Sequence, residues 1–578
     1  MAFQLSPGVL VTEKDLTNVV PAVSASIGAL AGNFSWGPAL EVKSIGSEVE
    51  LVKTFGRPTT TTFVDFFSAA NFLSYANNLR VVRVVGGDAK NAVTSGDGVL
   101  IKNEDNYANS FASGQSESGP WAAKYPGTLG NALKISIADS STFSSWDYKN
   151  DFDSAPGTSD FAANVGGSND ELHIIVIDET GAITGTAETI LEKFAFVSKA
   201  ADAKKNDGGT NYYKNIVNQN SQYVYWINHP TADADDLDGG ADWGSTVVGN
   251  SFALIDNITS TTWDGGGEIA TFTFSNGALD GAGDSEIIDG YAMFANAETI
   301  DINLVMASGH GSTVITSLIS DIAEVRKDCM VFVSPAQNDV VNQAGSEVSN
   351  ITSFRNGLTS SSYAVMDSGW KYQYDRYNDT YVWTPLNADV AGLCARTDET
   401  NDAWWSPAGL NRGVIKNTIK LAFSPTQSQR DDLYKIGINP VVSFAGQGTI
   451  LYGDKTLLAK PSAFDRINVR RLFIILEKSI ATSAKFQLFE FNDALTRSQF
   501  RSTVQSFLSN VQSRRGIYDF KVVCDETNNT GEVIDRNEFV ADIYVKPARS
   551  INFIQLNFVR SEEHTSELQS LAYLVCRL

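Results

Sequence analysis

Two stretches of alternating strands and helices, far apart in the chain, constrain the fold more than any other feature of the sequence. The first stretch predicts a strand, a helix and a strand, at residues 22–32, 63–77 and 79–85. The second predicts the same three elements, at residues 302–306, 313–328 and 329–333. Their Val-rich strands lack polar alternation, which is typical of a sheet covered by helices on both faces. We therefore expect one α/β domain built from both stretches.

The segment between the two stretches has a different composition. Residues 87–299 are rich in Gly, Ser, Asn and Asp, which favour turns. They also contain short apolar runs that predict strands, at residues 132–138, 172–178, 223–227 and 269–274. A turn-rich segment bracketed by two halves of one pattern indicates a β-rich inserted domain. The expected fold class is thus a multidomain α+β or α/β protein.

The C-terminal part of the chain predicts two amphipathic helices. The first follows the capping residues Ser462 and Asp465 and repeats apolar residues at helical spacing. The second lies near residues 492–515, has Thr496 and Gln499 as a capping box, and ends at Gly516. The apolar stripes consist of Val469, Leu472, Phe473, Leu476 and Ile480 in the first helix, and Phe500, Val504, Phe507, Leu508 and Val511 in the second. Both helices need a packing partner.

Beyond Gly516 the apolar period changes to two, which predicts strands at residues 518–524, 538–546 and 550–559. The last of these strands is apolar on both faces, and its unpaired edge would invite pairing with another chain. At the other end of the sequence Phe3, Leu5, Val9 and Val11 alternate with polar residues. This pattern predicts an extended arm with no neighbouring strand in the sequence. A terminal strand such as 550–559 often docks on another surface, whereas the N-terminal arm has no partner that the sequence identifies.

Composition excludes several classes of protein. At 578 residues the chain should form two to four domains. Its net charge of −23 argues against nucleic-acid binding, which needs a basic surface. The charge is uneven, because residues 461–560 hold 14 Lys and Arg against 11 Asp and Glu, an excess of three positive charges. No apolar run approaches the roughly 20 residues that cross a bilayer, so we expect no membrane insertion.

The search for catalytic and metal-binding motifs is negative. The sequence has no phosphate-binding loop, no GxSxG elbow, no HExxH and no GxGxxG after a strand. Its four cysteines are far apart and form no CxxC pair, so reduced structural thiols are favoured over a zinc site. His310, between two glycines, is the most site-like histidine, but a loop position is the favoured interpretation. We expect no enzyme activity, no catalytic residues, no metal and no cofactor.

Aromatic residues cluster in residues 361–460. They could bind a sugar or a base, but aromatic clusters more often pack against other protein surfaces. Together with the Gly- and Asn-rich insertion, they leave a surface glycan-binding protein as an alternative of a different class.

Nine stretches carry a family resemblance that spans both ends and the middle of the chain. They are LSPGV at Leu5, ALAGNFSWGPA at Ala29, NLRVVRVV at Asn78, KYQYDRYND at Lys371, AGLCARTD at Ala391, SPAGLNRG at Ser406, LYGDKT at Leu451, FDRINVRRLF at Phe464 and RNEFVADIYVKPARSINFIQLNFV at Arg536. With them the chain resembles the tail sheath proteins of contractile-tailed bacteriophages, of the T-even-like myovirus type. The resemblance is specific over residues 1–86 and 300–559 and weak in the insertion.

The resemblance implies a domain plan. An inner α/β sheath domain is formed by N- and C-terminal parts, and variable β-rich domains are inserted on the outside. The expected limits are an N-terminal arm at 1–21, the α/β base domain at 22–86 and 300–410, the outer domain at 87–299, and the C-terminal sheath domain at 411–559. From Arg560 the sequence RSEEHTSELQS reads like a translated sequencing adapter, so residues 560–578 are expected to be non-native.

The resemblance also implies a function without nucleotide hydrolysis. Subunits would form hexameric rings that stack helically around a tail tube protein, between baseplate and tail terminator proteins. The stack would contract to drive the tube through the host envelope during genome delivery. The expected location is the virion tail sheath, after assembly in the host cytoplasm. The same resemblance leaves open the sheath of a tailocin or another contractile injection system.

Two sets of residues are candidate assembly sites under this resemblance. The arms would add strands to sheets of neighbouring subunits, through Phe3, Leu5, Val9 and Val11 at one end and Ile551, Phe553, Ile554, Leu556 and Phe558 at the other. Basic residues of the two helices would face the tube: Arg466, Arg470, Arg471, Arg497, Arg501, Arg514 and Arg515. The alternative for these arginines is pairing within the subunit, and the sequence does not decide between the two.

Overall fold

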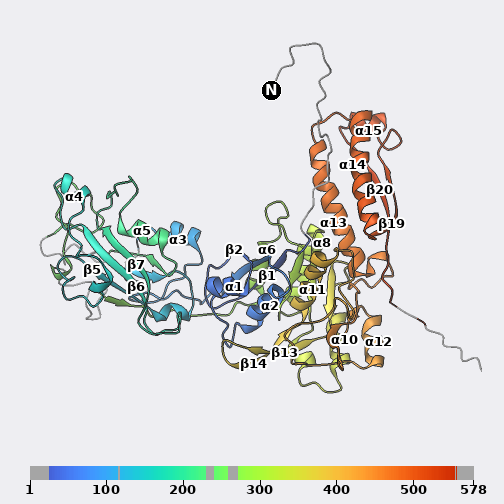
Figure 1. Ribbon diagram of the computed structural model, residues 1–578, viewed down its shortest axis with the longest axis horizontal. Coiled ribbons are helices and arrows are strands. Elements are labelled where there is room, and N and C mark those ends of the chain that lie inside the picture. Colours follow the sequence, from blue (N-terminus) through green and yellow to red (C-terminus); the bar gives the residue numbers. More distant parts are fainter. Residues whose placement is uncertain (1–24, 115–117, 230–239, 258–270, 553–554, 556–578) are drawn as a thin grey trace, which may run out of the picture.

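The computed structural model describes residues 25–114, 118–229, 240–257, 271–552 and 555, and arranges them in three lobes (Figure 1). A middle lobe contains a seven-stranded sheet. A β-rich outer lobe lies on one side of it, and a pair of long helices projects from its other side. The fold is mixed α/β with several sheets, as the sequence predicted.

The seven-stranded sheet joins strands from both halves of the chain. Its order is β16-β12-β11-β10-β1-β3-β2, and neighbours are parallel except β2, which is antiparallel to β3. The strands are β1 (Gly28–Asn33), β2 (Val42–Ile45), β3 (Leu79–Val84), β10 (Leu304–Met306), β11 (Met330–Val333), β12 (Ala364–Asp367) and β16 (Ile438–Asn439). Because β1 pairs directly with β10, the two separated stretches of the sequence form one domain core.

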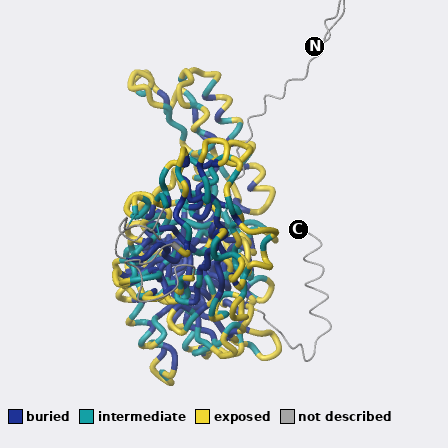
Figure 2. Tube along the Cα trace, turned by 90° about the vertical axis from the view of Figure 1, so that its left-hand side faces the viewer, coloured by how far each residue is buried: buried dark blue, intermediate teal, exposed yellow. Residues whose placement is uncertain are grey.

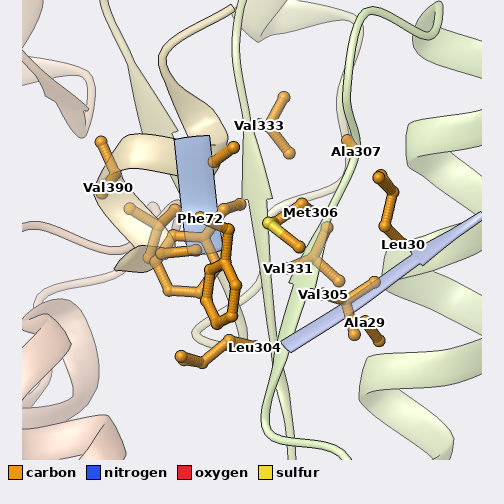
Figure 3. Close-up of a cluster of buried hydrophobic side chains, with 14 of the residues drawn as sticks. Ala29, Leu30, Phe72, Leu304, Val305, Met306, Ala307, Val331, Val333 and Val390 are labelled. Atoms are coloured by element: carbon orange, nitrogen blue, oxygen red, sulfur yellow. The ribbon is translucent and has the colours of Figure 1, made fainter. Parts of the chain in front are cut away.

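Helices cover both faces of this sheet. On one face α2 (Phe63–Leu73) packs on β1 and β3 and against α11 (Asn387–Thr400), which covers β10 to β12. On the other face α6 (Asp284–Ala292) packs on β1 and β3 and against α7 (Ser312–Ser317). Figure 3 shows side chains from strands and helices in contact, with Phe72 of α2 and Val390 of α11 beside the strand residues Met306 and Val331.

Small residues in β1 allow this close packing. A Cβ atom added to Gly28 would lie 2.6 Å from the Phe72 ring, and one added to Gly32 would lie 2.6 Å from the Asp65 carboxyl carbon. On the opposite face of β1, Ala31 lies beside Gly290 of α6. Larger side chains in this strand would separate the helices from the sheet.

The helix predicted at 313–328 is present as one continuous helical run with a π-helical middle. It consists of α7, a π-helical segment at Leu318–Ala323 and the short helix α8 (Glu324–Arg326), and it ends where Lys327 adopts a left-handed conformation with φ 62°. The apolar stripe is nevertheless buried on the sheet, through Val314, Ile315, Leu318, Ile319 and Ile322.

Smaller elements complete the middle lobe. Near the start of the chain α1 (Glu48–Phe55) contacts α2. The strands β13 (Trp370–Asp375), β14 (Thr380–Pro385) and β15 (Lys420–Leu421) form one small sheet, and β17 (Val441–Phe444) pairs with β18 (Gly448–Leu451). The remaining helices are α9 (Gln337–Val340), α10 (Glu347–Asn356) and α12 (Gln427–Lys435). Of the aromatic cluster, Trp370 is buried and donates to the Pro335 carbonyl oxygen, which is the packing role that we favoured.

The outer lobe is β-rich. Its four-stranded antiparallel sheet has the order β7-β6-β5-β9, and β4 pairs with β8. Its elements are α3 (Glu104–Ser110), β4 (Trp121–Ala123), β5 (Leu133–Ala138), α4 (Asp160–Asn164), β6 (Glu171–Asp178), β7 (Thr189–Ser198), α5 (Tyr213–Asn220), β8 (Val224–Trp226) and β9 (Thr271–Thr273). The helix α6, which the sequence placed within the insertion, packs on the sheet of the middle lobe instead.

A buried arginine ties the outer lobe to the middle lobe. The Arg83 side chain is fully buried at the end of β3. Its guanidinium donates to the carbonyl oxygens of Phe34 at 2.9 Å, Gly37 at 2.6 Å and Pro126 at 2.6 Å, and Pro126 lies in the outer lobe. Burial lowers the pKa of Arg83 to about 9. Three carbonyl oxygens thus solvate a charge that pairs with no carboxylate of the residues that the structure describes.

The C-terminal lobe contains the two predicted helices and a two-stranded sheet. The helix α13 (Ile467–Ala484) runs beside α14 (Ala494–Ser513), and β19 (Ile517–Val523) pairs antiparallel with β20 (Asp542–Pro547). A short helix, α15 (Gly531–Asp535), lies between the strands. The stripes predicted from the sequence meet in one core, where Leu472 and Leu476 pack with Phe500, Val504 and Leu508. No helix among the described residues is long and apolar enough to cross a membrane.

Two predicted boundaries in this lobe are wrong. The capping box was placed at Thr496, but α14 begins earlier, where the Asp493 carboxylate accepts from the Thr496 backbone N–H at 2.8 Å. The strand predicted at 550–559 is absent from its first three residues, which pair with no described strand. Ser550 and Asn552 bond through their side chains instead. Residues 553–554 and 556–559 of that prediction lie outside the described residues.

Candidate assembly surfaces

The two-stranded sheet β19–β20 offers a backbone surface for assembly. One face is apolar and packs on α14 through Phe520, Ile543 and Val545. The other face exposes Tyr518 and Tyr544, which are 59% and 60% accessible. Among the described residues neither outer edge of this pair has a neighbouring strand. Two strands rarely form a stable sheet alone, and unpaired edges can accept a strand from another chain.

The chain leaves β20 along the base of α13. Ser550 donates to the Asp454 carboxylate at 2.8 Å, and Asn552 bonds to the Tyr434 hydroxyl at 3.1 Å. Ile551 lies between these two anchors and is 81% exposed. Of the five residues predicted for the C-terminal inter-subunit strand, Ile551 is therefore held at the surface. The other four, Phe553, Ile554, Leu556 and Phe558, lie outside the described residues, as do Phe3, Leu5, Val9 and Val11 of the N-terminal arm.

Three of the seven candidate tube-facing arginines are buried in the subunit. Arg471 is 3% exposed and forms an ion pair with Asp398 at 2.5 Å. Burial lowers the pKa of Arg471, but the Asp398 carboxylate outweighs it and holds that pKa above its usual value. Arg470 donates to the Ser362 hydroxyl at 2.7 Å and lies over the Phe464 ring, and Arg497 donates to the Asn492 side chain. These three guanidinium groups are engaged inside the subunit.

The other four arginines are partly or fully accessible. Arg466 pairs with Asp454 at 3.0 Å and is partly buried. Arg501 lies 3.9 Å from the Asp525 carboxylate, and Arg514 pairs with Asp402, but both side chains keep substantial exposure. Arg515 is exposed at the end of α14, in a left-handed conformation with φ 66°. Of the seven candidate arginines, these four are the ones that could contact another protein without rearrangement of the core.

His310 lies in a polar cluster at the point where the parallel sheet reverses its order. Its Nε2 is 3.6 Å from the Asp65 carboxylate, and the Ser308 hydroxyl donates to the same carboxylate at 2.5 Å. A serine nucleophile would instead donate to the histidine, so the geometry is not that of a catalytic triad. Among the residues that the structure describes, no group of three or more His, Cys, Asp or Glu side chains could hold a metal ion.

Comparison with known proteins gives the family. Three family profiles match: the tail sheath protein Gp18 domain III N-terminal region over residues 26–84, the phage tail sheath protein central domain over residues 280–457, and the phage tail sheath C-terminal domain over residues 459–560. The chain is 36% identical to the tail sheath protein of Vibrio phage KVP40, over 96% of this chain and 98% of that relative. It is also 36% identical to the tail sheath protein of Enterobacteria phage T4, over 96% and 97%.

Solved structures agree with the fold. The crystal structure of a sheath tail protein from Listeria innocua matches with a TM-score of 0.53 and 13% identity, over 92% of this chain and 93% of that chain. A sheath tail protein from Desulfitobacterium hafniense matches with a TM-score of 0.52 and 13% identity, over 93% and 100%. Because relatives at 36% identity extend over nearly the whole chain, the chain belongs to the phage tail sheath proteins, the structural subunits of contractile phage tails.

Proposed function

We propose that the chain polymerises into stacked hexameric rings around a tail tube protein and that the stack contracts to drive the tube through the host envelope. The observation that carries this proposal is the two-stranded sheet β19–β20, whose edges have no neighbouring strand among the described residues. In a sheath protein such edges suit strands donated by the terminal arms of neighbouring subunits, which is β-augmentation. Baseplate and tail terminator proteins would close the two ends of the stack.

Contraction in this scheme requires no nucleotide, cofactor or catalytic residue. Each donated strand would contribute a few backbone hydrogen bonds worth about 1 kcal/mol net each. Burial of its apolar side chains would add roughly 25 cal/mol per Å². Such links can persist while the bodies of the subunits rotate. The extended lattice would be a kinetically trapped state, and the contracted lattice would bury more surface between subunits. Assembly would take place in the host cytoplasm.

The tube-facing surface is proposed to consist of the accessible arginines in α14 and directly after its C-terminal end. Arg501, Arg514 and Arg515 keep exposed guanidinium groups, whereas Arg470, Arg471 and Arg497 have partners inside the subunit. The sheath of a tailocin or another contractile injector remains a second candidate of the same class. A capsid gene beside the sheath gene would favour the phage tail.

Deletion of residues 1–20 tests the arm proposal. We expect the truncated protein to keep a folded α/β core, because the strands of that core begin at Gly28. It should fail to form tubes or rings, because the donated strand is gone. Electron microscopy of the purified full-length and truncated proteins measures the outcome, with circular dichroism as the control for folding. Normal tubes from the truncated protein would rule out an N-terminal strand donor.

A further inference from the structure

The connection between α13 and α14 exposes an unusual density of large apolar side chains. We define the tip as residues 485–495, which join these helices at the far end of the C-terminal lobe (Figure 1). Five of its side chains are exposed by 63% or more: Phe486 at 72%, Leu488 at 63%, Phe489 at 105%, Phe491 at 83% and Leu495 at 66%. In Figure 2 the projecting end of the lobe is mostly exposed or half-buried. Contiguous exposed apolar residues of this kind mark interaction sites.

The backbone of the tip is also strained. Phe489 has a φ of 72°, in the left-handed region that a bulky side chain rarely adopts. Glycine or asparagine would hold this turn with less strain. No contact with the described part of the subunit compensates for placing an aromatic ring there, because the ring is fully exposed. Local strain at an exposed aromatic residue therefore points to a role outside the subunit.

The charged residues of the tip and of the loop beside it are mostly acidic. Asn492 of the tip bonds to the Glu538 carbonyl oxygen at 2.8 Å, which joins residues 526–538 to the tip. The acidic residues of the two segments are Glu490, Asp493, Glu526, Glu532, Asp535 and Glu538, against Lys485 and Arg536. Glu490 stands between Phe489 and Phe491, is exposed, and has no ion pair with any described residue. A partner of the tip should thus be apolar with positive charge at its rim.

A cleft with these properties lies at the opposite end of α13. It is a half-open cleft with a volume of about 650 Å³. Its apolar lining comes from Pro461, Ala463, Val469 and Ile551, and its charged residues are Arg466, Arg549 and Asp465. Ser462, Ser550 and Asn552 complete the lining. Arg466 is neutralised by Asp454 and Asp465, but Arg549 is exposed and forms no ion pair in the part of the chain that the structure describes.

The tip cannot reach the cleft of its own chain. The cleft begins beside Arg466, one residue before α13, and the tip begins one residue after α13 ends. An 18-residue helix separates them by about 27 Å. A surface at one end of a subunit that is complementary to a surface at the other end makes a head-to-tail contact, which generates a ring if the rotation closes and an open stack if it does not.

We propose that the tip of one subunit seats in the cleft of a second copy of this chain, with Phe489 and Phe491 on the apolar lining and Glu490 beside Arg549. This contact rests on the proposed function and deepens it, because it supplies a side-chain contact between subunits in addition to the donated strands. The apolar residues provide affinity, and the Glu490–Arg549 pair selects the partner.

Intermolecular cross-linking tests the contact in the assembled protein. The background is full-length protein with Cys576→Ser, because the three described cysteines, Cys329, Cys394 and Cys524, are buried. The test variant carries Phe489→Cys and Ala463→Cys, and each single variant is a control. After treatment with a short bismaleimide, assembled tubes of the double variant should give a ladder of linked chains on a denaturing gel. Mixed single variants should give dimers only.

Charge reversal provides a second, independent measurement. Glu490→Arg and Arg549→Glu should each raise the protein concentration needed for tube formation by about tenfold or more, because like charges then face each other. The two changes together should restore assembly. Asp153→Arg, an exposed site of the outer lobe without an ion pair among the described residues, is the matched control and should assemble normally.

The outcomes separate this contact from the proposed function. If full-length protein with only Cys576→Ser forms no tubes, the sheath assembly itself is in question. If tubes form but the double-cysteine variant gives no ladder, the tip has another partner and the inference is overturned. Equal assembly of the two charge-reversed variants and the control would also overturn it.

Discussion

At the scale of single residues, a buried ion pair stabilises the outer lobe. In the outer lobe Lys199 and Asp139 are both fully buried, and Lys199 Nζ lies 2.8 Å from the Asp139 carboxylate. Lys199 also donates to the Ala253 carbonyl oxygen at 3.0 Å. Burial raises the pKa of Asp139, but Lys199 and further hydrogen bonds outweigh it and hold that pKa below its usual value. Burial lowers the pKa of Lys199, and the Asp139 carboxylate opposes that effect. The Asp139 carboxylate is therefore ionised at neutral pH.

Removal of Lys199 should destabilise the outer lobe. Lys199→Met leaves the Asp139 carboxylate buried without its partner, at a cost of about 3–5 kcal/mol. Hydrogen exchange of the β5 and β6 amides, read by mass spectrometry, should speed up, while amides of the middle lobe should not. Lys199→Met combined with Asp139→Leu should recover most of the protection. Unchanged exchange in the single variant would contradict the importance of this pair.

The same pair makes one contribution to the stability of the outer lobe depend on pH. A carboxylate with a lowered folded pKa contributes stability that is fully present above its unfolded value, about 3.9. That contribution is lost as pH falls through the lower folded value. The stabilisation by Asp139 should therefore be constant at neutral pH and disappear only below about pH 4.

At the scale of elements, the fit of α6 on the sheet depends on one glycine. A Cβ atom added to Gly290 would lie 2.4 Å from a Val84 methyl carbon, which is closer than such atoms approach. Gly290→Ala should therefore lower stability by about 1–3 kcal/mol. Gly281→Ala is the matched control, because nothing lies within 4 Å of its added Cβ. Thermal unfolding of both variants measures the difference, and equal midpoints would mean that α6 can shift freely.

The sequence predicted elements well where a local pattern decides them. The buried faces of α13 and α14 follow from apolar spacing, so Leu472, Phe500 and Val504 were placed correctly in the core. The partners of the arginines were not predictable, because Asp398 lies far from Arg471 in the chain and only the fold joins them. The exposed tip was missed as well. Its apolar residues resemble core residues by type, and only their solvent exposure marks them as a surface.

At the scale of the whole molecule, two adjacent chain segments, residues 86–90 and 278–280, connect the outer lobe to the middle lobe. Lys90 N–H donates to the Ala278 carbonyl oxygen at 2.9 Å, and Gly86 N–H donates to the Asp280 carbonyl oxygen at 3.1 Å. The chain thus enters and leaves the outer lobe at one place. Arg83 donates to Pro126, Trp36 packs against Tyr125 of the outer lobe, and Ala39 bonds to Lys102. Otherwise the middle lobe has its own core of buried side chains.

Removal of the outer lobe should therefore leave a folded subunit that still assembles. In the test variant, residues 91–277 are replaced by Asn-Gly, which closes a two-residue hairpin between Lys90 and Ala278. Arg83 keeps its bonds to Phe34 and Gly37 and becomes solvated on the open side. Electron microscopy should show tubes of smaller outer diameter than those of the full chain. A folded but monomeric variant would place assembly contacts on the outer lobe. An insoluble variant would show that the middle lobe needs the outer lobe to fold.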